Sequence, residues 1–235
     1  GLVGSEMCIR DRYIMKLSEN TVNVMKNFAT INPSLLVNPG DQLTTMAIDK
    51  GIFALATVEE TFPRQFAIYE MAKFLGIISL FKEPELEFGD HQVKIVSGRQ
   101  SVNYTYADPA TIVAPPADKG INFPAADIEF TISQEELQKL IRAAVVFQLP
   151  EIAVNGDGQT ITVTATNSKN PTTDTFSVEL GTTDKTFNMF FKRENIIKLL
   201  SADYNVKISA RGLSQFTTSG VTYYVAVEAN SHFNG

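Results

Sequence analysis

The hydrophobic positions in the first half of the chain predict two helices set between groups of strands. Apolar residues recur every three or four positions over 17–31 and over 70–81, which is typical of amphipathic helices. Alternating or short apolar runs predict the strands. These strands are expected at 34–37, 43–48, 52–58 and 66–69 before the second helix, and at 85–88, 91–97 and 101–107 after it. The first three and the last three are each expected to form a meander.

The second half repeats this order after a strand at 127–132. A helix is expected over 134–147, where Ser133 and Glu136 have the spacing of a capping box. A shorter, basic helix is expected at 192–200. The strands of this half are expected at 151–154, 160–166, 174–180 and 187–191 between the helices, and at 204–210, after Gly212 and at 221–229 beyond them.

The repeated order predicts an α+β fold of two similar domains, each with two helices packed on one face of antiparallel sheet. The expected domains are residues 15–113 and 125–235, joined by a linker at 114–124 that is rich in proline. Sequence identity between the halves is low. Two unrelated α+β domains with the same element order therefore remain an alternative to duplication.

Residues 1–14 differ in character from the rest. The run GLVGSEMCIRDRYI has no methionine at position 1 and resembles a translated sequencing adaptor, so we exclude it from the predicted fold. A natural tail or an expression scar is the alternative.

Charge is distributed unevenly along a chain whose net charge is −6. The windows 16–31, 70–82, 133–147 and 192–200 hold nine basic and five acidic residues, so the remainder carries −10. Such a pattern favours a basic lining within an acidic shell, which attracts DNA phosphates to one surface only. The alternative is that lysine and arginine occur on solvated helices because they form helices well. The expected DNA-facing residues are Lys26, Lys73, Lys139, Arg142, Lys192, Arg193 and Lys198.

The residues that carry chemistry are sparse. Cys8 is the only cysteine, and His91 and His232 are the only histidines, so we expect no disulfide, no metal site and no catalytic residues. Phosphate-binding glycine loops and nucleophile elbows are absent from the sequence. It also lacks the run of about 20 apolar residues that a membrane span needs. Zinc fingers and other base-reading motifs are missing, so any DNA contact is expected to be sequence-independent.

Several segments together carry a family resemblance. They are MKLSENTVNVMKNFATIN from Met15, AIYEMAKFLGIISL, ADPATIVAP, INFPAAD, LQKLIRAA and YYVAVEANSHF. From Met15 almost to its end, the chain resembles the DNA polymerase sliding clamps of T-even bacteriophages, whose fold is like that of proliferating cell nuclear antigen. The segment 192–200 is more basic than the family pattern, which leaves residue-by-residue transfer of DNA contacts open.

The resemblance implies a homotrimeric ring around double-stranded DNA that tethers the replicative DNA polymerase in the cytoplasm of the infected bacterial host. It also implies an ATP-dependent clamp loader and late transcription factors as partners, with no cofactor and no enzymatic activity. By the same resemblance, the subunit interface is expected at Val102, Tyr104, Tyr106, Thr175, Phe176, Val178 and Leu180. A pocket for partner peptides is expected at Val113, Pro115, Phe123, Tyr224, Val225 and Phe233, although ordinary packing explains these six residues equally well.

Two other functions remain open at this point. A non-enzymatic viral structural or assembly protein would also use duplicated sheets, and its helix charges would be incidental. A small acid–base enzyme would need a pocket of titratable residues that the sequence does not reveal.

Overall fold

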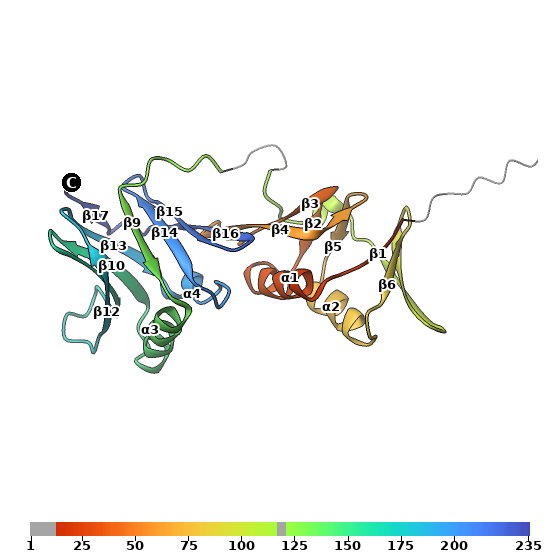
Figure 1. Ribbon diagram of the computed structural model, residues 1–235, viewed down its shortest axis with the longest axis horizontal. Helices are drawn as coiled ribbons and strands as arrows, with labels where there is room; N and C mark the ends of the chain where they lie inside the picture. The colour runs from red at the N-terminus through yellow and green to blue at the C-terminus, as the bar shows by residue number, and fades with distance from the viewer. Residues whose placement is uncertain (1–12, 117–120) are drawn as a thin grey trace, which may run out of the picture.

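The computed structural model describes residues 13–116 and 121–235, and it contains four α-helices in these ranges (Figure 1). The helices are α1 (Glu19–Ile31), α2 (Met71–Ser79), α3 (Gln134–Val146) and α4 (Arg193–Ile196). A short 3-10 helix, η1, spans Pro109–Thr111. The strands of the first half are β1 (Tyr13–Lys16), β2 (Leu35–Val37), β3 (Gly40–Met46), β4 (Ile52–Phe62), β5 (Phe66–Ile68), β6 (Glu85–Phe88), β7 (Gln92–Ser97) and β8 (Gln100–Thr105).

The second half has its own series of strands. They are β9 (Ile128–Ile132), β10 (Glu151–Asp157), β11 (Thr160–Thr166), β12 (Phe176–Thr182), β13 (Thr186–Lys192), β14 (Tyr204–Ser209), β15 (Leu213–Thr218), β16 (Val221–Ala226) and β17 (His232–Phe233). Apart from η1 and β17, the two halves share one order, which is strand, helix, four strands, helix and three strands. The predicted α+β fold of two similar halves is confirmed.

Strand pairing follows the repeat closely. The order β1-β6-β7-β8 in the first half corresponds to β9-β14-β15-β16 in the second. In the other layer, β12-β11-β10-β13 corresponds to the pairs β3-β4 and β2-β5. Both halves also carry a register irregularity in equivalent hairpins, between Gly40 and Gln42 in one and between Ile161 and Thr162 in the other. Equivalent positions in the two halves can therefore be matched from these ladders.

One sheet crosses from the first half into the second. β4 pairs antiparallel with β16, which gives a six-stranded sheet in the order β3-β4-β16-β15-β14-β9. A single hydrophobic cluster likewise extends through both halves. The halves are therefore joined by backbone hydrogen bonds and a shared core as well as by the linker.

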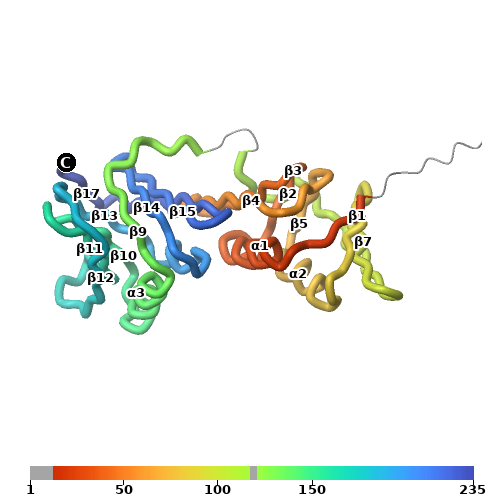
Figure 2. Tube along the Cα trace, viewed as in Figure 1, coloured from red at the N-terminus to blue at the C-terminus, as the bar shows by residue number. Residues whose placement is uncertain are grey.

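All four helices lie on the same side of the elongated molecule, and the chain between the halves passes over the opposite side (Figures 1 and 2). α1 and α2 cover the sheets of the first half, and α3 and α4 those of the second. Their apolar faces are buried as the periodicity predicted, with Met25 and Phe28 of α1 and Leu137 and Leu140 of α3 in the core. The helices thus present their polar faces to one common side.

Local signals fix where the two long helices begin. The Ser18 hydroxyl accepts a hydrogen bond from the backbone N–H of Thr21, which caps α1. Ser133 and Glu136 form the predicted capping box at α3, where each side chain accepts from the other residue's backbone N–H. The expected helix starts at 17 and 134 are therefore close to the observed ones.

The first half departs from the prediction in two places. β2 pairs with β5 and not with β3, so residues 34–58 do not form a three-strand meander. The chain turns at Gly40, whose φ of +114° suits glycine, and the ladder beyond it is irregular. The excluded segment 1–14 also overlaps β1, which pairs with β6 through Tyr13 and Ile14. Residues 1–12 lie outside the described residues.

The fourth helix is shorter than predicted. It covers only Arg193–Ile196 of the expected 192–200, and tight turns follow it. The backbone N–H of Leu200 donates to the Tyr223 hydroxyl at 3.3 Å, which is a side-chain alternative to a helical acceptor. Sequence periodicity could not reveal this competitor, because Tyr223 lies on a different strand.

Candidate nucleic-acid interface and assembly edges

The basic residues expected to face DNA lie within the four helices or within two residues of their ends. Lys26, Lys73, Lys139, Arg142 and Lys192 are exposed, whereas Arg193 and Lys198 are partly buried. The helices proper carry a smaller basic excess than the sequence windows suggested. Five basic and four acidic residues lie within α1 to α4, because Lys16, Lys82, Lys192 and Lys198 fall just outside them. The positive charge is therefore concentrated at the helix ends as much as along the helices.

Two of these basic side chains bind within the chain. The Lys139 Nζ lies 2.6 Å from a carboxylate oxygen of Glu135, one turn earlier in α3. The hydrogen bond from Lys139 lowers the pKa of the Glu135 carboxyl, and the ammonium charge adds to this effect. Arg193 donates through Nη1 to the carbonyl of Ala144 at 3.2 Å, at the end of α3. Arg193 thereby caps α3 and is less available to a phosphate.

A polar network joins α1 of the first half to the turn after α4 of the second half, beside the β4–β16 junction. The Tyr223 hydroxyl donates to Asn27 Oδ1 at 2.7 Å, and Asn27 Nδ2 donates to the carbonyl of Lys198 at 2.8 Å. Burial raises the pKa of Tyr223, so its phenol remains protonated and available as a donor. α1 is thereby fixed to the turn after α4.

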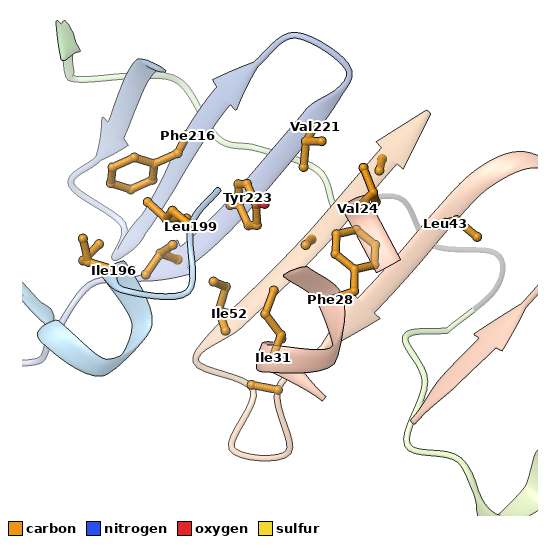
Figure 3. Packing of buried hydrophobic residues seen from close by; sticks show 14 of the residues in the cluster. Val24, Phe28, Ile31, Leu43, Ile52, Ile196, Leu199, Phe216, Val221 and Tyr223 are labelled. Carbon is orange, nitrogen blue, oxygen red and sulfur yellow. The ribbon is translucent and has the colours of Figure 1, made fainter. Parts of the chain in front are cut away.

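Apolar side chains from both halves fill the space around this network. The side chains of α1 in this cluster, Val24, Phe28 and Ile31, lie near Ile52 of β4 and on one side of Tyr223 of β16. Leu199 and Ile196 lie on the other side of Tyr223 (Figure 3). The ladder pairs Ala54 with Tyr223 and Ala56 with Val221. Small residues on β4 therefore leave room for larger ones on β16.

Two strands have an unpaired edge at opposite ends of the molecule. β8 is an edge strand of the sheet β1-β6-β7-β8. β12 is an edge strand of the sheet β12-β11-β10-β13-β17. The expected interface residues Val102, Phe176, Val178 and Leu180 are partly buried on these strands, and Tyr104 is buried. Thr175 is exposed just before β12, and Tyr106 follows β8, where burial raises its pKa to about 12. Open backbone edges of this kind invite pairing with another strand.

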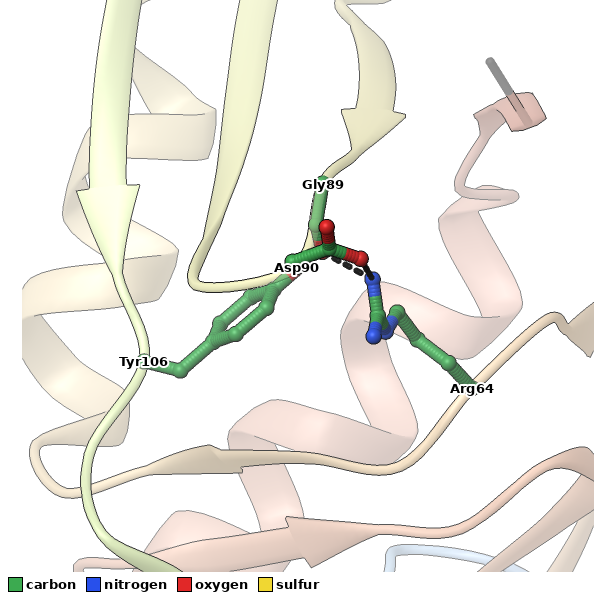
Figure 4. Close-up of polar contacts among 4 residues, drawn as sticks. All are labelled: Arg64, Gly89, Asp90 and Tyr106. Atoms are coloured by element: carbon green, nitrogen blue, oxygen red, sulfur yellow. Dashed lines mark hydrogen bonds and ion pairs between the residues drawn. The ribbon is translucent and has the colours of Figure 1, made fainter. Parts of the chain in front are cut away.

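The end of the β8 sheet is held by a contact group that the sequence did not single out (Figure 4). Arg64 donates to the Gly89 carbonyl and, at 3.0 Å, to the Asp90 carboxylate. The Tyr106 hydroxyl donates to the same Gly89 carbonyl at 3.3 Å. This group fixes the β6–β7 turn, which carries His91, against the segment that follows β8.

Part of the expected peptide pocket is brought together beside the linker. A cavity of about 430 Å³ is lined by Asn38, Pro39, Gln42, Thr44, Phe53, Leu55, Pro115, Pro116, Ile121 and Tyr224. Of the expected residues, Pro115 and Tyr224 line it, and Phe123 lies against the Tyr224 ring, 6.4 Å between centroids. Phe53 was missed, because nothing in the sequence indicates that β4 pairs with β16.

The other three expected pocket residues do not line this cavity. Val225 is buried in the core. Phe233 lies on β17, where its ring stacks on Phe187 at 6.2 Å. The side chain of Val113 is exposed, and its backbone carbonyl accepts a hydrogen bond from the Asn32 side chain.

The described residues contain no group of three or more His, Cys, Asp or Glu side chains placed to hold a metal ion. Among the helices of residues 13–116 and 121–235, none has the length and apolar character to cross a membrane.

The duplicated domains, the continuous sheets and the helices on one side define the class of the fold as a DNA clamp. Solved clamps share it. Proliferating Cellular Nuclear Antigen from Entamoeba histolytica superposes with a TM-score of 0.70 at 14% identity, covering 92% of this chain and 99% of that one. The DNA polymerase III subunit beta from Pseudomonas aeruginosa gives 0.63 at 14% identity, and this chain spans 65% of its length.

Sequence comparison identifies the family. Residues 16–114 match the family model described as DNA polymerase processivity factor, and residues 129–229 match gp45 sliding clamp, C terminal. The Sliding clamp of Enterobacteria phage T4 is 32% identical over 227 residues, covering 92% of this chain and 98% of that protein. The Sliding clamp of Vibrio phage KVP40 is 31% identical over 223 residues, covering 92% and 100%. The chain belongs to the bacteriophage sliding clamp family of DNA polymerase processivity factors.

Proposed function

We propose that three copies of this chain close into a ring around double-stranded DNA and tether the replicative DNA polymerase to it, without catalysing a reaction themselves. The observation that carries this proposal is the match between the free edges and the joined pair inside the chain. β8 is the equivalent of β16, and β12 is the equivalent of β4. A second copy can therefore pair its β12 with β8 in the way that β4 pairs with β16.

This repetition supports a closed assembly. When a free edge at one end fits the free edge at the other end, identical subunits join head to tail, and a constant rotation brings the last subunit back to the first. Pairing β8 with β12 in turn removes both open edges. Three two-domain subunits give six similar sheets and a shared inner side lined by helices.

Weak contacts to phosphates suit such a ring. Lys26, Lys73 and Lys139 are exposed on three helices that face one side, and Lys192 and Lys198 flank α4. Lysine side chains on mobile stems attract phosphates without reading bases. The ring stays on DNA because it is closed, so these contacts can remain exchangeable and permit sliding. Tethering then raises the concentration of the polymerase at the primer end.

Partners would engage the cavity beside the linker. Its apolar lining of Phe53, Leu55, Pro115, Ile121 and Tyr224 suits a short hydrophobic peptide. We assign the polymerase, an ATP-dependent clamp loader and late transcription factors of the phage to this site, in the cytoplasm of the infected bacterial host.

The test is the mass and shape of the native particle. The proposal predicts an oligomer of three times 25.9 kDa and, by electron microscopy, a ring with a hole wide enough for duplex DNA. A monomer at all concentrations, or a compact particle without a hole, would overturn it.

A further inference from the structure

The strand ladders match the residues of α1 to those of α3. Lys16 pairs with Glu85 two residues before the cap Ser18, and Thr131 pairs with Asn205 two residues before the cap Ser133. The strands β6 and β14 are matched in turn through the β7–β8 and β15–β16 hairpins, which have two-residue turns at Gly98 and Gly220. Both helices are 13 residues long.

This alignment makes Arg142 the equivalent of Asn27, because each lies nine residues after its cap. Asn27 links α1 to the turn after α4 through the carbonyl of Lys198, across the β4–β16 junction. Arg142 is exposed, and no hydrogen bond or ion pair joins it to another residue in the described ranges. Asn27 acts at the junction of β4 with β16. The equivalent place for Arg142 is the junction of β12 with β8, which forms only when a second copy is present.

The flank of α3 around Arg142 is apolar and uncovered. Val146 is 74% exposed, whereas its equivalent in α1, Ile31, is 6% exposed and lies beside Ile52 of β4 (Figure 3). Val145 and Phe147 add to this exposed apolar surface. The end of α3 is therefore apolar and exposed, whereas the equivalent end of α1 is buried. An exposed apolar patch of this kind indicates a surface that another chain covers.

The surface that would cover it lies beside β8. A groove of about 440 Å³ is lined by Tyr69, Glu70, Lys73, Ile77, Val102, Asn103, Tyr104, Thr105 and Ala107. It lies between α2 and β8, the equivalents of α4 and β16. Inside the chain, Asn27 binds the carbonyl of Lys198 after α4 and the hydroxyl of Tyr223 on β16. The last turn of α2 carries no basic residue. A cation is stabilised there by the carbonyls at the end of the helix.

We propose that Arg142 is a subunit-interface residue that hydrogen-bonds the carbonyls of the last turn of α2 in the neighbouring subunit, while Val146 enters the groove between α2 and β8. This inference rests on the proposed ring and specifies its helix contacts. It moves Arg142 out of the DNA-facing set, and a guanidinium suits the role because it reaches further than the Asn27 amide and donates several hydrogen bonds.

The first test measures assembly of the full chain by mass photometry over a concentration series. Arg142→Gln is expected to raise the dissociation constant between subunits about tenfold, the effect of losing one hydrogen bond from a charged group. Lys26→Gln removes the same charge from α1, away from both edges, and is expected to leave assembly unchanged. Equal assembly of wild type and Arg142→Gln would overturn the inference while leaving the ring intact. A wild-type chain that never assembles would instead overturn the proposed function.

A second variant keeps the test independent of folding defects. Asn27 is bound by Tyr223, and the equivalent of Tyr223 on β8 is Val102. The double variant Arg142→Asn with Val102→Tyr copies the internal pair and is expected to assemble more tightly than Arg142→Asn alone. If Val102→Tyr weakens assembly to the same extent in the wild type and in Arg142→Asn, the assigned contact is wrong.

Discussion

The registers inside the chain predict which residues of two subunits lie opposite each other. The hairpin β3–β4 pairs Gln42 with Thr57, and its equivalent β11–β12 pairs Thr162 with Glu179, next to the register irregularity in each. Thr57 is therefore the equivalent of Glu179. Leu55 is then the equivalent of Ser177. Thr222, which pairs with Leu55, is the equivalent of Ser101. Ser101 of one subunit is therefore expected opposite Ser177 of the next, and both are exposed in the single chain.

A cysteine pair converts this register into a covalent test. Directly opposed residues of antiparallel strands have Cα atoms about 4.5 to 5.5 Å apart. Disulfides form over Cα separations of about 4.4 to 6.8 Å. In a Cys8→Ser background, Ser101→Cys with Ser177→Cys should form disulfides between subunits. Ser101→Cys with Glu179→Cys is the matched control, since a shift of two residues gives about 7 to 8 Å, beyond that range.

The assay is mild oxidation followed by a denaturing gel without reductant. The first pair is predicted to give covalent dimers and trimers, and no larger species, whereas the control stays monomeric. Preferred cross-linking of the control pair would show that the register is wrong by two residues. Absence of cross-links from both pairs, at concentrations where the protein is oligomeric, would refute edge-to-edge pairing of β8 with β12.

Three further predictions concern the junction, the helices and a cap. Tyr223→Phe and Asn27→Ala should each lower the free energy of unfolding by about 1 to 2 kcal/mol in urea titrations, and non-additively, since both break one network. Burial raises the pKa of Tyr223, so its contribution to the free energy of unfolding is complete below about pH 10, the pKa of a tyrosine in the unfolded chain, and declines at higher pH. The difference in that free energy between wild type and Tyr223→Phe should therefore narrow above about pH 10. Lys26→Glu with Lys192→Glu should weaken DNA retention and flatten its salt dependence while leaving the oligomer mass unchanged; unaltered retention would exclude these two lysines from the DNA-facing surface. Ser133→Ala should cost about 1 kcal/mol of stability through the lost cap of α3, and an unchanged melting curve would contradict that role.

Much of the fold could be predicted because its signals are local. Helical periodicity placed α1, and periodicity with the capping box at Ser133 placed α3, each to within two residues. The hairpins β7–β8 and β15–β16 followed from alternating residues around short glycine-containing turns. These elements depend on neighbours in the sequence, so the sequence alone was sufficient.

Long-range pairing was not predictable in the same way. Nothing near Ile52 or Val221 indicates that β4 and β16 pair, so the shared sheet and the place of Phe53 in the cavity were missed. The strand β1 was missed because its first two residues, Tyr13 and Ile14, were excluded with the foreign-looking segment before them. The backbone N–H of Leu200, in the turns after α4, donates to the hydroxyl of Tyr223, which is 23 residues further along the chain.

The sequence could place the basic residues on or beside helices, but it could not show what each side chain contacts. Lys26, Lys73 and Lys139 are exposed on their helices, but Arg193 binds Ala144 within the chain. Charge counting cannot separate a lysine that points to solvent from an arginine that caps a neighbouring helix. The repeat itself supplied the stronger argument, because it shows the geometry of one junction inside the chain.

The decisive measurement is topological. Cross-links between Ser101→Cys and Ser177→Cys are closed in the presence of circular duplex DNA, and the complex is washed in high salt to remove electrostatic binding. The closed trimer is predicted to remain on the circle and to be released when a restriction enzyme linearises the DNA. Loss from the circle in high salt, or equal retention after linearisation, would contradict a ring that encircles DNA.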